Sequence, residues 1–235
     1  MGPPIDDELN PEAFPIMRAL PELVVRMLRD HYYAGVKKAE VRFRHHAADE
    51  DAVTGALGER LIEPQILIQA DGQVYEWSTS YYKLRGRGPN APEKHLGADG
   101  IFQLEVLDQR RHYIVRKGLL FQAKTDWNGR DARLVGQARE LLEQSRSAIV
   151  IDYSRDGYSA IPATDVIEAE GFRERIRPAA DRTLAEVLGD EFVGCTRGDP
   201  GLYWEPERER LIFAGERVSD RIPADFIGTR IQRLQ

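Results

Sequence analysis

Residues 99–124, DGIFQLEVLDQRRHYIVRKGLLFQAK, decide the fold of this chain. They contain two runs rich in strand-forming residues, 101–107 and 113–124, and the polar turn 108–111 joins the two runs. Two strands connected by so short a turn pair side by side in a sheet. The stretch therefore predicts two neighbouring strands, with Asp99 at the start of the first and Lys124 at the end of the second.

The chain before this stretch predicts two helices and a hairpin. From Pro21 onward, apolar residues recur at the spacing of one helix face. A second helix is expected over 49–62, and its first turn is crowded with acidic residues, which favour the positive end of a helix dipole. Strand-forming residues then flank Asp71-Gly72, a strong hairpin turn signal.

The chain after this stretch predicts a helix over 131–145, a short buried strand over 148–153, a returning strand over 158–161 and a helix over 183–188. The order of the core elements is then helix, strand, strand, strand, helix, strand. Such an order favours an α/β fold with a central mixed β-sheet flanked by helices.

The domain organisation follows from the same pattern. Four prolines fall within residues 1–20, which we expect to be an extended Pro-rich segment. No linker divides the rest convincingly, so we expect a single α/β domain over 21–235 with a C-terminal extension.

Composition restricts the classes of function. The chain has 235 residues, of which 42% are hydrophobic and 31% charged, and it has no apolar run of 18 residues, so we expect no membrane span and no membrane partner. The acidic, Pro-rich start does not resemble a signal peptide, and a single cysteine, Cys195, excludes an internal disulfide and a CxxC zinc site. A cytoplasmic location is the expectation.

The net charge of −6 bears on any nucleic-acid function. A protein that binds duplex DNA alone gains much of its affinity by neutralising phosphates and is usually basic. If this chain acts on nucleic acid, its basic residues must be concentrated locally, or another chain must deliver the substrate.

Asp99 and the tripeptide Gln122-Ala123-Lys124 carry the candidate chemistry. Residues i and i+2 of a strand share a face, so Gln122 and Lys124 point the same way and can converge with Asp99 if the two strands pair. The Asp99 carboxylate, the Gln122 side-chain carbonyl and the Ala123 backbone carbonyl are oxygen ligands for a hard divalent cation. Such an ion polarises a phosphoryl group, and Lys124 can orient water or offset transition-state charge.

This pattern resembles the PD-(D/E)XK nuclease superfamily, in its variants with Gln-x-Lys, which are similar to restriction and anti-phage defence nucleases. The resemblance covers roughly residues 21–163 and rests on Glu50-Asp51-Ala52-Val53-Thr54, Gly97-Ala98-Asp99, Gln122-Ala123-Lys124 and Gln137. It implies a restriction-endonuclease-like core and a metal-dependent endonuclease that uses Mg²⁺ or Mn²⁺. It further implies a DNA substrate, a role in prokaryotic antiviral defence, and a supporting position for Gln137.

One departure from the commoner motif matters, because Gln122 is neutral and leaves the site one negative charge short. On a helix that starts at Asp49, Glu50 lies at the edge of the apolar face and points inward, whereas Glu59 lies about 180° away. We therefore expect Glu50 to supply the missing charge. Glu93, in the Pro-rich loop before Asp99, is the alternative.

Contacts with nucleic acid are expected from the loop before Asp99. Arg85 and Arg87 are flanked by glycines and suit phosphate contact. Tyr81 and Tyr82 have the chemistry to stack on a base, although packing in the core or within the hairpin is the ordinary interpretation.

Three functions stay open at this point. The first is a DNA endonuclease that a partner or oligomerisation activates, because an acidic chain binds DNA poorly alone. The second is a non-catalytic nuclease-fold scaffold or binding module in a larger complex. The third is a nuclease that acts on RNA or on single strands.

Overall fold

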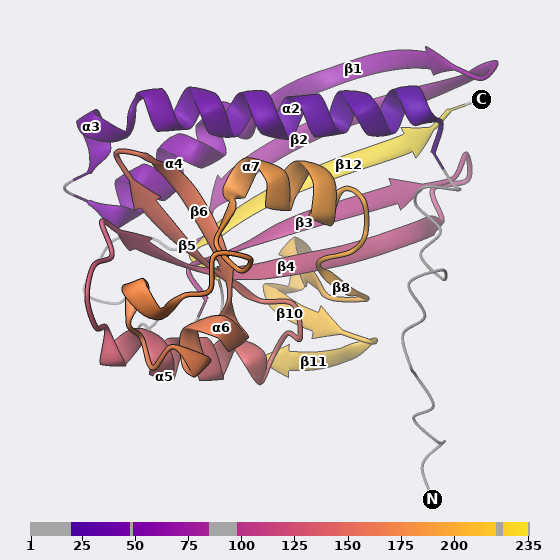
Figure 1. Cartoon of the computed structure of the whole chain (residues 1–235). Coiled ribbons are helices and arrows are strands. Elements are labelled where there is room, and N and C mark those ends of the chain that lie inside the picture. Colours follow the sequence, from indigo (N-terminus) through magenta and orange to yellow (C-terminus); the bar gives the residue numbers. More distant parts are fainter. Residues whose placement is uncertain (1–19, 48, 85–97, 220–222, 235) are drawn as a thin grey trace, which may run out of the picture.

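A mixed β-sheet of nine strands organises the computed structural model, which describes residues 20–47, 49–84, 98–219 and 223–234. The sheet has the order β1-β2-β12-β3-β4-β5-β6-β7, and β8 pairs with β4. The strands are β1 (Glu63–Ala70), β2 (Gln73–Lys83), β3 (Gly100–Leu107), β4 (Tyr113–Thr125), β5 (Ile149–Ser154), β6 (Gly157–Pro162), β7 (Arg182–Thr183), β8 (Asp199–Pro200) and β12 (Asp225–Arg233). Figure 1 shows the long central strands running side by side.

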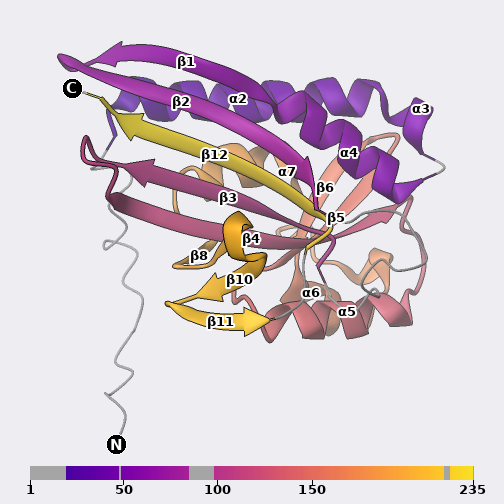
Figure 2. The same cartoon turned by 180° about the vertical axis from the view of Figure 1, so that it is seen from behind.

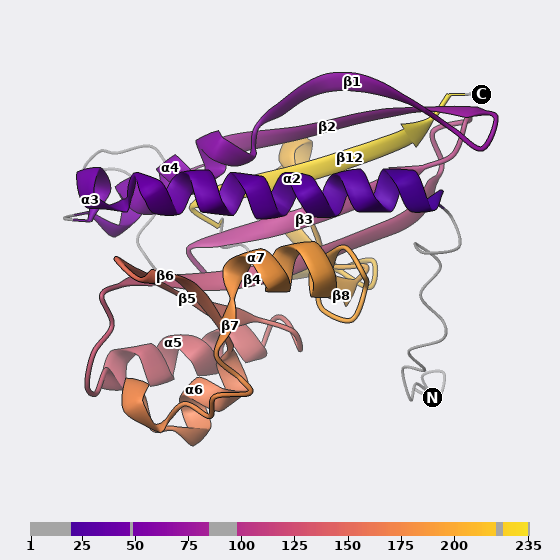
Figure 3. The same cartoon turned by 45° about the horizontal axis from the view of Figure 1, so that its top comes forward.

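Helices cover both faces of this sheet, which confirms the predicted α/β class. One face carries α2 (Glu22–Val41), α4 (Glu50–Leu61), α7 (Leu184–Glu186) and the π-helical segment Val187–Phe192. The other carries α5 (Ala132–Leu142), α6 (Ala163–Glu168) and a small sheet of β9 (Tyr203–Glu205), β10 (Arg210–Phe213) and β11 (Glu216–Ser219). A short helix, α3 (Phe43–His46), joins α2 to α4. Figure 3 shows α2 lying along the sheet and α5 and α6 on its opposite side.

The stretch 99–124 forms the predicted pair. β3 and β4 are antiparallel, and Gly100 lies opposite Phe121 in their register. β5 then adds parallel to β4, with Gln122 opposite Val150 and Lys124 opposite Asp152. This arrangement brings the end of β4 and the beginning of β3 to the same edge of the sheet.

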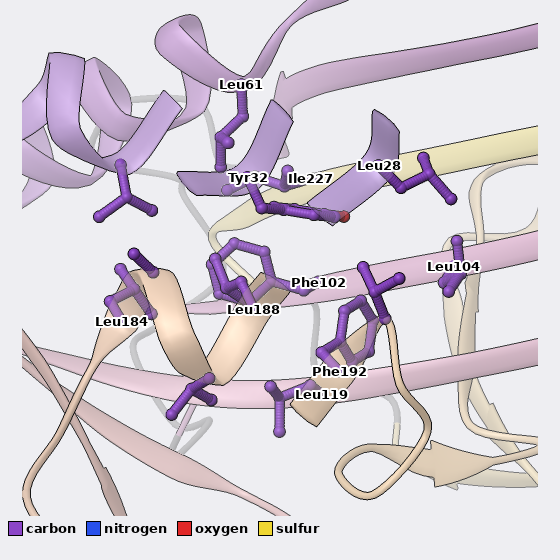
Figure 4. Close-up of a cluster of buried hydrophobic side chains, with 14 of the residues drawn as sticks. Leu28, Tyr32, Leu61, Phe102, Leu104, Leu119, Leu184, Leu188, Phe192 and Ile227 are labelled. Atoms are coloured by element: carbon purple, nitrogen blue, oxygen red, sulfur yellow. The ribbon is translucent and has the colours of Figure 1, made fainter. Parts of the chain in front are cut away.

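The largest buried cluster fills the space between α2 and the sheet (Figure 4). Leu28 and Tyr32 of α2 lie one helical turn apart and face Phe102 of β3 and Phe192 of the π-helical segment. The Tyr32 hydroxyl is 2.8 Å from the Thr229 hydroxyl, which lies 2.9 Å from the Thr79 hydroxyl. These contacts fix α2 over β12 and β2.

The prediction of a C-terminal extension outside the core is wrong for the last strand, β12. β12 lies inside the sheet, antiparallel to β2 and parallel to β3. Its side chains alternate, so that Ile227, Thr229 and Ile231 face α2 while Phe226 and Gly228 face the other side. Residues on both faces of β12 pack against other elements, as expected for a central strand.

Other expectations need smaller corrections. The hairpin adds an outer strand, β1, so the described residues between α4 and α5 form four strands rather than three. The helix expected over 131–145 ends at Leu142, and the one expected over 183–188 is a three-residue α-helix that continues as a π-helix. Tyr81 packs against the core, as expected, whereas Tyr82 is 57% exposed. Residues 1–19 of the expected Pro-rich segment lie outside the described residues.

Within the described ranges, no helix is long and apolar enough to span a membrane.

The central position of β12 makes its buried face essential for stability. Ile227→Ala removes a fully buried side chain, so we expect the free energy of unfolding to fall by about 2–5 kcal/mol. Arg233→Ala, an exposed change on the same strand, should alter it by less than about 0.5 kcal/mol. Urea unfolding measures both, and similar small effects would contradict a packed central strand.

Candidate active site at the strand ends

Asp99 is held against β4 by backbone hydrogen bonds. Its N–H donates to the Phe121 carbonyl at 2.8 Å, and its Oδ2 accepts the Ala123 N–H at 2.8 Å. Because β3 begins at Gly100, the Ala123 peptide extends past the end of that strand and meets the Asp99 side chain instead of a strand neighbour. The strand pairing thus brings Asp99 and Gln122 together, as the sequence predicted.

Gln122 lies beside this carboxylate and is only 2% exposed. Its Nε2 donates to Asp99 Oδ2 and, at 3.3 Å, to the Ala123 carbonyl. Its Oε1 is buried and has no hydrogen-bond partner among the described residues. The amide therefore occupies the point at which a carboxylate oxygen and a backbone carbonyl converge.

Lys124 lies on the same face of β4 as Gln122, because the intervening Ala123 belongs to the cluster on the opposite face. The Lys124 side chain is 18% exposed, and its Nζ is 3.7 Å from Asp131 Oδ2. Asp131 caps α5 by accepting the Leu134 N–H at 2.9 Å. The ammonium group is thereby positioned between the end of β4 and the start of α5.

Glu50 approaches the same point from the first turn of α4. Burial raises the pKa of its carboxyl to about 7; Lys124 lowers that pKa, and Asp99 raises it. Both electrostatic partners are candidate site residues, which agrees with the inward orientation predicted for Glu50. Glu59 is exposed, as predicted from its position on the helix.

A further carboxylate, Asp225, joins the site from the start of β12. It is 1% exposed, its N–H donates to the Asp99 carbonyl at 2.9 Å, and its Oδ1 accepts the Tyr81 hydroxyl at 2.7 Å. Its pKa is raised to about 6, mainly by burial, and the negative charge of Asp99 contributes to this rise. Sequence reasoning missed Asp225 because it did not identify β12, although Asp225 directly precedes the alternating run FIGTRIQR.

Of the remaining predicted residues, the structure describes only Gln137. Gln137 lies on α5, and its buried Oε1 has no hydrogen-bond partner among the described residues. Glu93, Arg85 and Arg87 fall within 85–97, outside the residues that the structure describes.

The donor set differs from a cluster of acidic side chains. In the described part of the chain, no three His, Cys, Asp or Glu side chains are grouped so that they would hold a metal. The candidate ligands are instead one carboxylate, one amide and one backbone carbonyl, from Asp99, Gln122 and Ala123. All three supply the oxygen donors that Mg²⁺ and Mn²⁺ prefer, and the unpartnered Gln122 oxygen fits such a role.

Comparison with known proteins found no family model, no curated protein and no solved structure that matches this chain.

The raised pKa of Glu50 predicts a pH-dependent cost to stability. Between about pH 4.5 and pH 7 the unfolded chain releases this proton while the folded chain retains it, so stability falls as the pH rises through this window. Glu50→Gln cannot ionise, so in a chelator its melting temperature should exceed that of the wild type by an amount that grows from pH 5 to pH 8. Glu59→Gln is the exposed control, and identical pH profiles for all three proteins would contradict a raised pKa of the half-buried Glu50.

The contact between Gln122 and Asp99 predicts a cation-dependent effect on stability. In the wild type, Gln122 Nε2 donates to Asp99 Oδ2 and to the Ala123 carbonyl. Gln122→Glu replaces this donor with a carboxylate oxygen, so in the absence of a divalent cation the melting temperature should fall by several degrees. Added Mg²⁺ or Mn²⁺ should recover more of that loss than it adds to the wild type.

Gln144→Glu is the matched control for this change. It buries the same new charge beyond the end of α5, away from the strand ends. It should lower the melting temperature with no cation dependence, and the same behaviour from both variants would argue against a cation beside Gln122.

Proposed function

We propose that this chain is a metal-dependent nuclease that hydrolyses phosphodiester bonds, with DNA as its substrate class. The observation that carries the proposal is the convergence of Asp99, Gln122 and the Ala123 peptide, with Lys124 and Glu50 electrostatically coupled beside them. This is the constellation that phosphodiester hydrolysis requires: oxygen donors for a divalent cation, a cationic group and a carboxyl that titrates near neutral pH.

Three oxygens would hold the Mg²⁺ or Mn²⁺: the Asp99 carboxylate, the Gln122 side-chain oxygen and the Ala123 carbonyl. When bound, the ion would polarise the phosphoryl group and favour hydroxide formation from water. An amide has a donor at one end and an acceptor at the other. Gln122 can thus face the two oxygens with its nitrogen in the metal-free chain and with its oxygen when a cation is present.

Lys124 and Glu50 have complementary roles in this proposal. The Lys124 side chain is only 18% exposed, so its positive charge is partly shielded from water and can offset negative charge that develops on the phosphate. Glu50, with a pKa of about 7, exists near neutral pH in both protonation states. It can therefore accept a proton from an attacking water, and as a carboxylate it supplies the charge that Gln122 lacks.

Substrate delivery is part of the same proposal. The chain has a net charge of −6, so electrostatics do not favour binding of DNA to the isolated chain. We expect a partner protein or oligomerisation to complete a DNA-binding surface and so to activate cleavage. This control suits the antiviral role, in the cytoplasm of a prokaryote, that the resemblance implies.

A non-catalytic binding module is the second candidate. It is favoured by the absence, among the described residues, of three grouped acidic side chains, and by the ion pair of Lys124 with Asp131. This alternative predicts nucleic-acid binding without cation-dependent cleavage.

Cleavage assays separate the two candidates. With Mg²⁺ or Mn²⁺, we expect the wild type to cut plasmid or single-stranded circular DNA and Asp99→Ala to be inactive although folded. Glu50→Gln should reduce the rate by about 10²-fold, as for loss of an acid–base group, while Glu59→Gln should leave it unchanged. The same assay with circular RNA tests the third function, a nuclease that acts on RNA. Full activity of a folded Asp99→Ala protein would overturn the site assignment.

A further inference from the structure

A cleft of about 560 Å³ lies on the same face of the sheet as Gln122 and Lys124. Its floor is formed by β2, β12 and β3, and its walls by β4, β9 and the turn after β9. Figure 2 views the sheet from this side, with β10 and β11 below the long strands in the view. Sites for small molecules typically have volumes of roughly 300–1,000 Å³, so the cleft has room for a nucleoside-sized group.

One end of the cleft is a pair of aromatic rings. Tyr82 is 57% exposed and stacks on Phe226, with ring centroids 6.0 Å apart and an interplanar angle of 29°. The Phe226 ring lies over Gly228, where a Cβ atom would come within 2.4 Å of it. The glycine therefore lets Phe226 lie along the floor and support an exposed tyrosine ring.

The other end is a stack of three flat groups. The Arg116 guanidinium lies 3.3 Å from the Tyr113 ring centroid and 4.0 Å from that of Tyr203. Glu105 fixes this arginine from the floor, with Oε1 3.0 Å from Arg116 Nε. Tyr113 is 48% exposed, so this stack also presents an aromatic surface.

The charged side chains of the lining carry three negative charges, on Glu105, Glu205 and Glu207, against two positive ones, on Arg116 and Arg230, so the lining as a whole does not favour a phosphate group. Arg116 is paired with Glu105, and Glu205 accepts from Arg210 at 2.6 Å. Between the aromatic ends, the floor presents the hydroxyl-bearing residues Ser78 and Ser80. Flat rings with small polar groups between them recognise an uncharged aromatic ring, such as a nucleobase, better than a phosphate group.

β12 leads from the candidate active site to the cleft. Asp225, which contacts Asp99, directly precedes Phe226, and the lining extends to Arg230. At about 3.3 Å per residue, the far end lies roughly 16 Å from the strand end. A strand bound at the active site would therefore reach the cleft within a few nucleotides.

We propose that this cleft stacks an unpaired base of the nucleic-acid strand, so that the substrate class is single-stranded or locally unpaired nucleic acid. The inference rests on the proposed function for the presence of a strand at the site. The aromatic surfaces of the cleft are separate from the groups that would perform hydrolysis.

Binding in a chelator tests the cleft without cleavage. Fluorescence anisotropy would compare three labelled 12-mers on the wild-type chain: a single strand, an abasic strand with the same phosphates, and a duplex. We expect the single strand to bind at least about tenfold more tightly than the abasic strand, from one or more stacked bases. The duplex should bind more weakly than the single strand.

Variants locate this preference for bases. Tyr82→Ala and Tyr113→Ala should each reduce the ratio of single-strand to abasic affinity by several-fold or more, while Tyr82→Phe should retain it because the ring is preserved. Leu67→Ala, a 66% exposed site on β1, is the surface control and should behave as the wild type. Both tyrosines are about half exposed, so their loss should leave the melting temperature nearly unchanged.

The outcomes separate this inference from the proposed function. Equal affinity for the single strand and the abasic strand, or a preference for bases that both alanine variants retain, would overturn the cleft proposal even if the wild type cleaves with Mg²⁺. A preference for bases that both alanine variants lose would support the cleft even if no cleavage occurs, in which case only the catalytic proposal fails.

Discussion

The antiparallel register of β3 and β4 is the constraint on which the rest of the molecule depends. It places Gly100 opposite Phe121, so the Ala123 peptide extends beyond the end of β3 and bonds to the Asp99 carboxylate. A shift of one residue would turn Gln122 and Lys124 to the opposite face, where Phe121 and Ala123 now pack. The two-residue periodicity of one strand thus determines both the core and the candidate site.

Much of this arrangement could be predicted from the sequence, because local signals encode it. The runs 101–107 and 113–124, and the acidic first turn of α4, have clear periodicity or clear turn chemistry. From these the convergence of Asp99 with Gln122, and the inward orientation of Glu50, follow by geometry. The raised pKa of Glu50 does not follow, since it depends on the packing of α4 against the end of the sheet.

The parts that escaped prediction depend on contacts between distant segments. β12 gives a good strand signal, but no local pattern says that it inserts between β2 and β3, and Asp225 was missed for that reason. The π-helical segment ends at Phe192, whose carbonyl accepts a hydrogen bond from the fully buried Lys117 on β4. The cleft combines side chains from six segments that are distant in sequence. The sequence alone therefore could not show that Tyr82 lines a cleft with an exposed ring.

The position of β12 also sets the timing of assembly during protein synthesis. β3 leaves the ribosome roughly 120 residues before its parallel partner, which takes about 6–24 s at ordinary elongation rates. Until then β2 and β3 lack the strand between them, and Asp225 is absent from its place beside Asp99. A nascent or truncated chain therefore lacks the strand that completes both the sheet and the candidate site, and the site can form as described only after β12 has been added.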